Sequence, residues 1–246
     1  MRQPAEDWQD AGMTTQIVLV PGFWLGAWAW DHVAPLLADR GYAVTPLTLP
    51  GLEPDNPARG EITLDDHAEA IAAVLDRGVE RRVLVVHSGA ALPGTMVLDR
   101  HPGLVDHVIF VDTAPVRDGY AMNADLEDPE FPLSAAWESE MAEGSMRDLT
   151  DEQLQIFRDR AVPQPGHTVR GQVLLSNPAR LAVPGTVVCT AFPSTDYRSY
   201  AEQGAGFLAG LLDHTALAYV DLPTGHWPMW SRPVELAEVI DRAAAG

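Results

Sequence analysis

Short apolar runs alternate with helical patterns along most of this chain. The runs are rich in β-branched residues and lack strict apolar–polar alternation, which is typical of strands buried in a parallel sheet. Six such strands are predicted: Gln16–Val20, Ala43–Leu49, Arg82–Val86, Val108–Asp112, Gly185–Thr190 and Ala216–Val220. Pro46 within the second strand favours an edge position, because proline cannot donate a hydrogen bond to a neighbouring strand.

Helical patterns fill the intervals between these strands. Thr63 can cap one helix, and the carboxylates of Asp65 and Asp66 favour the positive end of that helix. Helices are predicted over Ala29–Arg40, from Thr63 to Asp76, over Gly89–Arg100, around Ser199–Leu212 and over Pro233–Ala244. The alternation predicts an α/β fold: a six-stranded, mostly parallel sheet with helices on both faces.

The alternation stops over residues 113–183. This stretch is acidic and helical in pattern, most clearly at Ala135–Met141 and Asp151–Ala161, and it is far longer than a crossover connection needs. We therefore predict a helical cap at residues 113–183, inserted into a core formed by residues 16–112 and 184–246. Residues 1–15 are predicted to be a flexible N-terminal segment.

The charge balance narrows the classes of partner. The 246 residues include 16 Lys and Arg against 35 Asp and Glu, a formal net charge of −19. Such a surface repels polyphosphates and anionic lipids, so we expect no nucleic-acid or membrane partner. No apolar run approaches the ~18 residues of a membrane span, and the first residues do not resemble a signal peptide. A cytoplasmic protein is predicted, and the sequence does not indicate its oligomeric state.

One serine lies where the pattern changes most sharply. The strand Arg82–Val86 runs into His87-Ser88-Gly89, and an Ala-rich helix follows at once. A strand that turns into a helix within about three residues strains the turning residue and lifts its side chain above the sheet. This arrangement is a nucleophile elbow, and it predicts that Ser88 is a catalytic nucleophile.

A nucleophilic serine needs a base, and His226 is the strongest candidate among the eight histidines. It follows the last predicted strand, and loops after the carboxyl ends of parallel strands meet at one edge of the sheet, where ligands bind. Ser88 and His226 both lie at such ends. His87 should point elsewhere, because neighbouring residues on a strand alternate faces.

Acyl transfer also needs fixed N–H donors for the oxyanion. Gly89 is one candidate, because it lies at a helix start, where backbone N–H groups are free. Phe23 is the other, in the loop after the first strand, and Gly22 before it lets the backbone approach closely.

Together these residues resemble the α/β-hydrolase fold, in the small esterase-like branch that contains plant methylesterases, hydroxynitrile lyases and bacterial esterases. Three features carry the resemblance. They are the elbow at Ser88, the oxyanion loop with Gly22, Gly26, Trp28 and Trp30, and the pair Gly225-His226 before the last helix. The resemblance covers residues 16 to about 244, except for the cap.

Three positions depart from the family pattern. Pro21 stands where the family usually has histidine, and Val86 and Ala90 stand where glycines usually flank the elbow. Val86 adds a β-branched side chain where the strand and the helix pass closely, so we expect the helix to shift slightly.

The acid that orients His226 is open between two aspartates. The family most often places it after the penultimate strand, where Asp196 comes several residues late. Some relatives, such as certain haloalkane dehalogenases, place it after the strand that follows the elbow, which here ends at Asp112. A charge that ends a buried apolar strand needs a partner, and His226 can be that partner. We predict Asp112, with Asp196 as the alternative.

The resemblance implies a serine hydrolase that cleaves a carboxylic ester, a lactone or an amide through an acyl-enzyme. Trp24, Trp137 and Trp227 are predicted to contact the substrate, and such aromatic side chains favour an uncharged, fairly apolar small molecule. No cluster of His, Asp and Glu has metal-ligand spacing, so no metal or other cofactor is expected. Two alternatives stay open: a lyase that cleaves a cyanohydrin or another C–C bond, and a small-molecule-binding protein without turnover.

Overall fold

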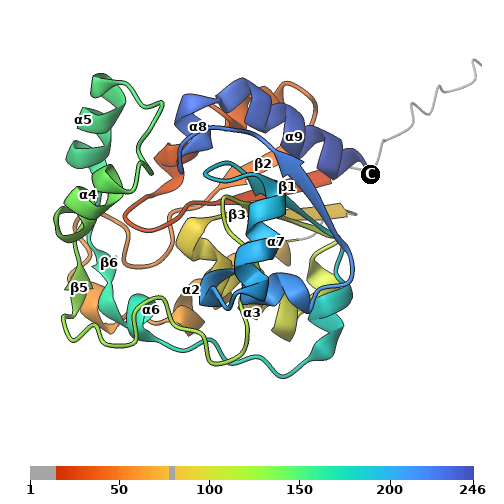
Figure 1. Cartoon of the computed structure of the whole chain (residues 1–246), viewed down its shortest axis with the longest axis horizontal. Helices are drawn as coiled ribbons and strands as arrows, with labels where there is room; N and C mark the ends of the chain where they lie inside the picture. Colours follow the sequence, from red (N-terminus) through yellow and green to blue (C-terminus); the bar gives the residue numbers. More distant parts are fainter. Residues whose placement is uncertain (1–14, 78–80) are drawn as a thin grey trace, which may run out of the picture.

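A six-stranded sheet forms the centre of the computed structural model, which describes residues 15–77 and 81–246. The strand order is β2-β1-β3-β4-β7-β8, and each neighbouring pair is parallel (Figure 1). The strands are β1 (Thr15–Val20), β2 (Ala43–Pro46), β3 (Arg81–His87), β4 (His107–Val111), β7 (Gly185–Cys189) and β8 (Leu217–Asp221). All six predicted strands are present, although β2 ends at Pro46 rather than at Leu49. β2 lies at the edge of the sheet, as Pro46 indicated. The segment predicted to be flexible lies outside the described residues, except for Thr15.

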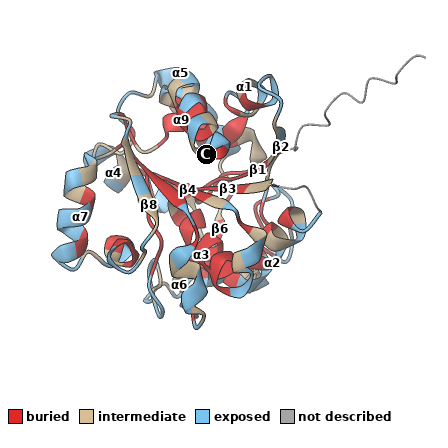
Figure 2. Cartoon of the chain, turned by 90° about the vertical axis from the view of Figure 1, so that its right-hand side faces the viewer, coloured by how far each residue is buried: buried red, intermediate tan, exposed pale blue. Residues whose placement is uncertain are grey.

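Helices cover both faces of this sheet (Figure 2). On one face lie α1 (Ala34–Ala38) and α9 (Pro233–Ala245), and on the other lie α2 (Leu64–Leu75) and α3 (Ala91–Arg100). Successive side chains of a strand point alternately toward these two layers of helices. In β3, Val85 packs in the cluster that contains α1 and α9, whereas Leu84 packs in the cluster that contains α2 and α3. Both faces are buried, which explains why the strands are apolar throughout.

The start of α2 follows the predicted capping pattern. The Thr63 hydroxyl accepts a hydrogen bond from the Asp66 N–H at 3.3 Å, and the Asp66 carboxylate accepts one from the Thr63 N–H at 2.8 Å. This reciprocal pair satisfies two backbone donors that a helix start leaves free. The capping role of Thr63 is therefore confirmed.

Two predicted helices were wrong in extent. The helix predicted over Ala29–Arg40 is a 3₁₀ turn (Ala27–Trp30) followed by the short α1, because Pro35 is tolerated only in the first turn of a helix. The helix predicted around Ser199–Leu212 begins earlier as α7 (Ser194–Glu202) and continues as a 3₁₀ segment (Gly206–Leu212). Gly204 lies between them with a φ of 94°, a left-handed conformation that ends α7.

The region predicted as a cap supplies no strand to the central sheet. It contains α4 (Leu133–Ala142), α5 (Asp151–Arg160), α6 (Gly166–Arg170) and the antiparallel pair of β5 (Glu130–Phe131) and β6 (Gln164–Pro165). These elements lie together at one side of the core in Figure 1. The division of the chain into core and cap stays a prediction, and we keep the name cap for residues 113–183. No helix within residues 15–77 and 81–246 is long and apolar enough to cross a membrane.

The unusual Val86 is accommodated by a glycine on the following helix. A Cβ built on Gly94 in α3 would lie only 2.7 Å from Cγ1 of Val86. The space that the family pattern provides with a glycine on the strand is provided here by a glycine on the helix.

Candidate active site

Ser88 lies directly after β3 and begins a 3₁₀ turn (Ser88–Ala90) that leads into α3. Its φ is 52°, in the left-handed region that residues with a Cβ rarely adopt. Such a conformation costs about 1–3 kcal/mol and persists only where the surrounding structure imposes it. The abrupt turn that the sequence predicted is therefore present at Ser88.

Three of the predicted residues meet at the carboxyl edge of the sheet. Nε2 of His226 lies 2.8 Å from Oγ of Ser88, and Nδ1 of His226 lies 2.5 Å from Oδ2 of Asp112. Asp112 comes immediately after β4 and has a φ of 46°, and His226 follows β8. The alternative acid, Asp196, lies in the first turn of α7, where its carboxylate accepts a hydrogen bond from the adjacent Thr195. The structure thus brings Asp112, and not Asp196, to His226.

Asp112 is held as a buried carboxylate by four donors. Oδ2 faces His226, while Oδ1 accepts from the N–H groups of Thr190 at 3.1 Å and Ala191 at 2.9 Å and from the Tyr197 hydroxyl. Burial alone would raise the pKa of this carboxyl, but its hydrogen bonds and the charge of His226 lower that pKa well below the ordinary value. Asp112 therefore stays negative and fixed beside the imidazole.

The pKa of His226 is raised above its ordinary value. Burial would lower it, but the hydrogen bond and the negative charge of Asp112 outweigh burial, and the charge of Glu140 adds to the effect. The imidazolium form is thus stabilised at the position where a proton taken from Ser88 would arrive.

Tyr197 is a site residue that the sequence reasoning missed. It lies on α7, its side chain is 3% exposed, and its hydroxyl donates to Asp112. Its burial and the Asp112 charge raise the pKa of this phenol, so it remains a donor. The available signal was the spacing of Tyr197 and Ala201, which places both on the buried face of α7.

His87 joins the two loops that flank the site. Its Nδ1 accepts a hydrogen bond from the Gly22 N–H at 3.3 Å, and its Nε2 lies 2.7 Å from the backbone oxygen of His226. Burial lowers the pKa of His87 to about 3, so the ring is neutral, and its one proton is on Nε2, which faces a carbonyl oxygen. His87 thus fixes the position of the His226 backbone relative to the oxyanion loop.

The two residues predicted to supply the oxyanion donors, Phe23 and Gly89, are in contact with each other next to the elbow. A Cβ built on Gly22 would be 2.8 Å from Cβ of Ser88, so the loop after β1 passes directly against the elbow. A Cβ built on Gly89 would be 2.3 Å from the ring of Phe23, so this ring packs directly against the Gly89 backbone. A larger residue at position 22 would clash with Ser88 and His87, and one at position 89 would displace the Phe23 ring.

The cap holds the His226 loop through its backbone. The Ser145 carbonyl accepts a hydrogen bond from the His226 N–H at 2.7 Å. The Arg147 guanidinium donates to three carbonyls, those of Thr190, Ala191 and Thr224, in the loops after β7 and β8. The cap therefore helps to position the predicted base.

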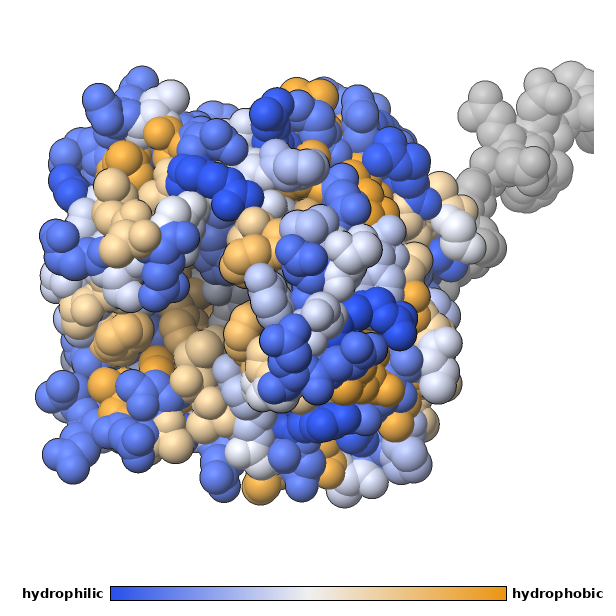
Figure 3. Space-filling view, in the orientation of Figure 1, coloured by the Kyte–Doolittle hydropathy of each residue, from blue (hydrophilic) through white to orange (hydrophobic). Residues whose placement is uncertain are grey.

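A cavity of about 340 Å³ opens over Ser88 and His226. It lies between α4 and α7, where the surface in Figure 3 is hollowed. The remaining lining residues come from the cap, from the loops after β4 and β7, from α7 and from the 3₁₀ segment that follows it. They include Met122, Glu140, Glu143, Phe192, Tyr197 and Phe207. No group of three or more His, Cys, Asp or Glu among the described residues is arranged to hold a metal ion.

The predicted substrate contacts Trp24, Trp137 and Trp227 do not line this cavity. They are 5%, 9% and 2% exposed and pack together with Phe157 in the core between the cap and the sheet. Apolar residues of the cap and of the α7 region, which the sequence analysis did not single out, line it instead.

The chain matches the sequence model of the alpha/beta hydrolase family over residues 17–239, and it belongs to that family. The predicted α/β-hydrolase fold is thereby confirmed.

Named relatives match only part of the chain. Methylesterase 8 of Arabidopsis thaliana is 33% identical over 102 residues, which are 40% of this chain and 38% of the relative. Esterase PIR7B of Oryza sativa subsp. japonica is 32% identical over 117 residues, which are 45% of this chain and 43% of the relative. The matched segments thus span less than half of either relative.

Solved structures match over nearly the whole length. An Arabidopsis methylesterase has a TM-score of 0.70 at 19% identity and covers 94% of this chain and 99% of its own. A pyrethroid hydrolase from Sphingobium faniae has a TM-score of 0.69 at 19% identity and covers 95% and 98%. At this level of identity, the likeness demonstrates a shared fold.

Proposed function

We propose that this protein hydrolyses carboxylic esters through an acyl-enzyme on Ser88, without a cofactor. The observation that carries this proposal is the continuous hydrogen-bonded chain from Ser88 Oγ through His226 to Asp112, with distances of 2.8 Å and 2.5 Å. The partly matching relatives named methylesterase and esterase support the same class of bond.

In the acylation step, His226 Nε2 takes the proton of Ser88 as Oγ attacks the carbonyl carbon of the ester. The N–H groups of Phe23 and Gly89 stabilise the oxyanion that forms. Asp112 stabilises the imidazolium, which then gives its proton to the departing alcohol oxygen. The product of this step is an ester of Ser88 and one free alcohol.

In the deacylation step, His226 acts as a base again and removes a proton from water. The water oxygen attacks the acyl carbon, and His226 returns the proton to Ser88 Oγ as the carboxylic acid leaves. The enzyme is regenerated, and each turnover consumes one ester and one water.

The cavity favours an uncharged substrate with an apolar part. Met122, Phe192 and Phe207 supply apolar surface in the cavity that Ser88 lines, while the carboxylates of Glu140 and Glu143 disfavour an anionic group. A small neutral ester therefore fits this environment.

The proposal is tested with p-nitrophenyl esters of graded chain length and a fluorophosphonate probe. Wild-type protein should turn over the esters and be labelled once, whereas Ser88→Ala should lose labelling and lower kcat by on the order of 10⁵–10⁶-fold. Ser134→Ala, at an exposed position of α4, should keep both ester turnover and labelling by the probe.

Three results would count against this proposal. Turnover that survives in folded Ser88→Ala would exclude Ser88 as the nucleophile. Folded wild-type protein with neither labelling nor turnover would support a binding protein. Release of aldehyde from a cyanohydrin without ester hydrolysis would support a lyase.

A further inference from the structure

We propose that Arg147 of the cap is a positioning residue for the reaction, because its guanidinium charge acts on Asp112 through a single peptide group. The same guanidinium joins the loop that holds the acid to the loop that carries the base. The inference rests on the proposed ester hydrolysis, and it adds a fourth side chain to the chain of Ser88, His226 and Asp112.

One nitrogen of Arg147 meets three backbone carbonyls. Nη2 donates to the carbonyl oxygens of Thr190 at 2.9 Å and Ala191 at 3.0 Å, in the loop after β7, and to that of Thr224, in the loop after β8. No carboxylate among residues 15–77 and 81–246 forms an ion pair with this guanidinium. Hydrogen bonds from an ionised donor are about twice as strong as neutral ones, so the guanidinium holds the two loops together.

One peptide group of the loop after β7 contacts both Arg147 and Asp112. This group joins Thr190 to Ala191. Its carbonyl oxygen accepts from Arg147, and its N–H donates to Oδ1 of Asp112 at 2.9 Å. Hydrogen bonds in series polarise one another, so a positive charge on the carbonyl strengthens the N–H as a donor to the carboxylate. Because Oδ2 of Asp112 faces His226, the charge of Arg147 draws negative charge away from the imidazole.

The cap segment that carries Arg147 is packed against the loop after β8. A Cβ built on Gly225 would lie 2.3 Å from the Arg147 carbonyl oxygen and 2.7 Å from that of Ser145. Oδ2 of Asp148 accepts a hydrogen bond from the Thr224 hydroxyl at 3.1 Å. These contacts fix the point from which the Arg147 side chain reaches the two loops.

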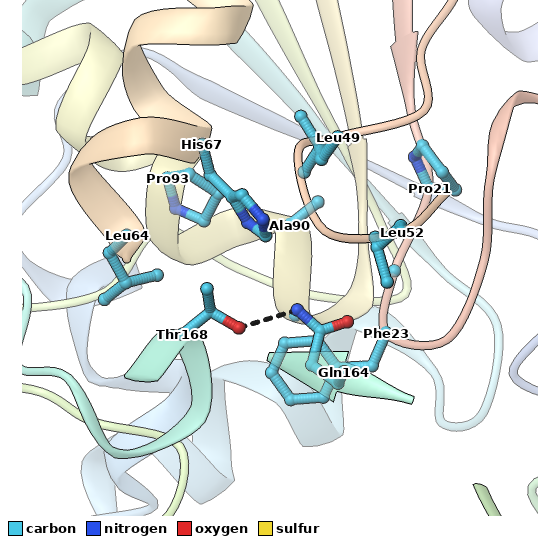
Figure 4. A pocket seen from close by; sticks show the side chains of 12 residues that line it. Pro21, Phe23, Leu49, Leu52, Leu64, His67, Ala90, Pro93, Gln164 and Thr168 are labelled. Carbon is cyan, nitrogen blue, oxygen red and sulfur yellow. Dashed lines mark hydrogen bonds between the residues drawn. The ribbon is translucent and has the colours of Figure 1, made fainter. Parts of the chain in front are cut away.

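The cap contacts the oxyanion loop through neutral groups instead. The Trp24 N–H donates to Oε1 of Gln164 at 3.2 Å, and Nε2 of Gln164 donates to the Thr168 hydroxyl at 2.7 Å, the bond drawn in Figure 4. The Val162 N–H donates to the Trp24 carbonyl at 2.9 Å. Amide and hydroxyl groups thus join the cap to this loop, whereas a cation is placed at the loops of the acid and the base.

The charge of Arg147 has a measurable consequence for His226. The other charged groups that act on His226 are Asp112 and Glu140, which are both negative, and the neighbouring His87 is neutral. Removing a positive charge should therefore stabilise the imidazolium and raise the pKa of His226. A merely structural role predicts the opposite, because looser loops would let burial lower this pKa as the hydrogen bond to Asp112 weakens.

Two substitutions separate the charge from the contact. Arg147→Gln keeps an N–H₂ donor without the charge, whereas Arg147→Lys keeps the charge and supplies three donors. With a p-nitrophenyl ester, Arg147→Gln should lower kcat about tenfold at the alkaline plateau and leave KM nearly unchanged. The acidic limb of its kcat/KM profile should move to higher pH by a few tenths of a unit, because the guanidinium is exposed to water.

Arg147→Lys should recover most of both changes. Arg158→Gln is the matched control, since Arg158 is an exposed arginine of the same cap whose guanidinium lies over the Trp137 ring. This control should keep the wild-type kcat and the wild-type pH profile.

The pKa of His226 can also be measured without an ester, from the NMR chemical shift of its Hε1 proton as the pH varies. The signal is assigned by its loss in His226→Asn. A His226 pKa that falls or stays unchanged in Arg147→Gln, or that is the same in the Gln and Lys variants, would overturn this inference. If folded wild-type protein cleaves no ester, the proposed function fails, and the titration still reports whether Arg147 acts on His226.

Discussion

At the scale of single residues, Asp112 depends on a hydroxyl from a distant helix. Tyr197 donates to the carboxylate oxygen that does not face His226. This hydrogen bond spreads the negative charge of Asp112 away from the imidazole and fixes the carboxylate plane. Tyr197 is therefore a positioning residue, since it acts on the reaction through Asp112.

Replacement of Tyr197 by phenylalanine tests this role, because it removes the hydroxyl and keeps the ring. The Asp112 charge then concentrates toward His226 and stabilises the imidazolium further. Because catalysis needs neutral His226, the acidic limb of the kcat/KM profile should move to higher pH. A lost hydrogen bond to a charged group should also lower kcat about tenfold. Ester kinetics between about pH 5 and 9 would measure both effects.

Tyr200→Phe is the matched control for Tyr197→Phe. Tyr200 lies on the same helix, is 37% exposed, and packs edge-to-face on Phe192 with ring centroids 5.5 Å apart. Its variant should keep the wild-type pH profile. A Tyr197→Phe profile that coincides with the Tyr200→Phe profile would reduce Tyr197 to a packing role.

At the scale of elements, the strands and the residues at their carboxyl ends could be predicted, because the local hydrophobic pattern determines them. The strand ends place Ser88, Asp112 and His226 at one sheet edge, so the site could be assembled from the order of strands alone. Extents of helices were less predictable where Pro35 restricts the start of α1 and where Gly204 ends α7. At these positions a proline or a glycine determines where the helix begins or ends, even though the hydrophobic periodicity continues.

Contacts between elements far apart in sequence could not be predicted. The bonds from Ser145 and Arg147 to the loops around the site depend on how the cap folds back over the core, which no local pattern specifies. The surroundings of the tryptophans predicted to contact the substrate also depend on elements far apart in sequence. Trp137 and Trp227 are large apolar side chains, and burying them against Phe157 removes more apolar surface from water than lining an open cavity would.

The contact between β3 and α3 provides a test at this scale. Gly94→Ala would normally stabilise a helix by about 1 kcal/mol, but here the new methyl would lie 2.7 Å from Val86 Cγ1. We expect a net destabilisation of about 1–3 kcal/mol, measured by urea unfolding.

A double-mutant cycle with Val86→Ala isolates this contact. Removing the valine methyls makes room for the Gly94→Ala methyl, so the double variant should be more stable than the two single effects predict. Strict additivity of the two changes would show that the β3–α3 spacing does not depend on this pair.

At the scale of the whole molecule, buried histidines link stability to pH. Burial lowers the pKa of His67 to about 4 and that of His87 to about 3. Both folded pKa values lie below the unfolded value of about 6.5, so folding favours the neutral rings. Their contribution to stability is complete above that value and is lost as pH falls from about 6.5 toward the folded pKa values.

His67→Gln should reduce this acid sensitivity. Nε2 of His67 donates to the Pro50 carbonyl at 2.8 Å, and a glutamine amide can donate there without titrating. Between pH 8 and pH 5, the free energy of unfolding should fall by about 2 kcal/mol less in the variant than in wild type. Urea unfolding at both pH values gives the comparison. The exposed His32→Gln should behave as wild type, and equal losses in all three proteins would contradict the assignment.

The main chain of the loop after β7 binds both Asp112 and Arg147. Its N–H groups at Thr190 and Ala191 hold Asp112, and its carbonyls at the same two residues accept from Arg147. Neither interaction uses a side chain of Ala191 or Phe192, yet both residues line the cavity over Ser88. Mutation can therefore change this wall while the acid stays in place, so the loop is a natural site for new specificities to evolve and for combinatorial libraries to sample.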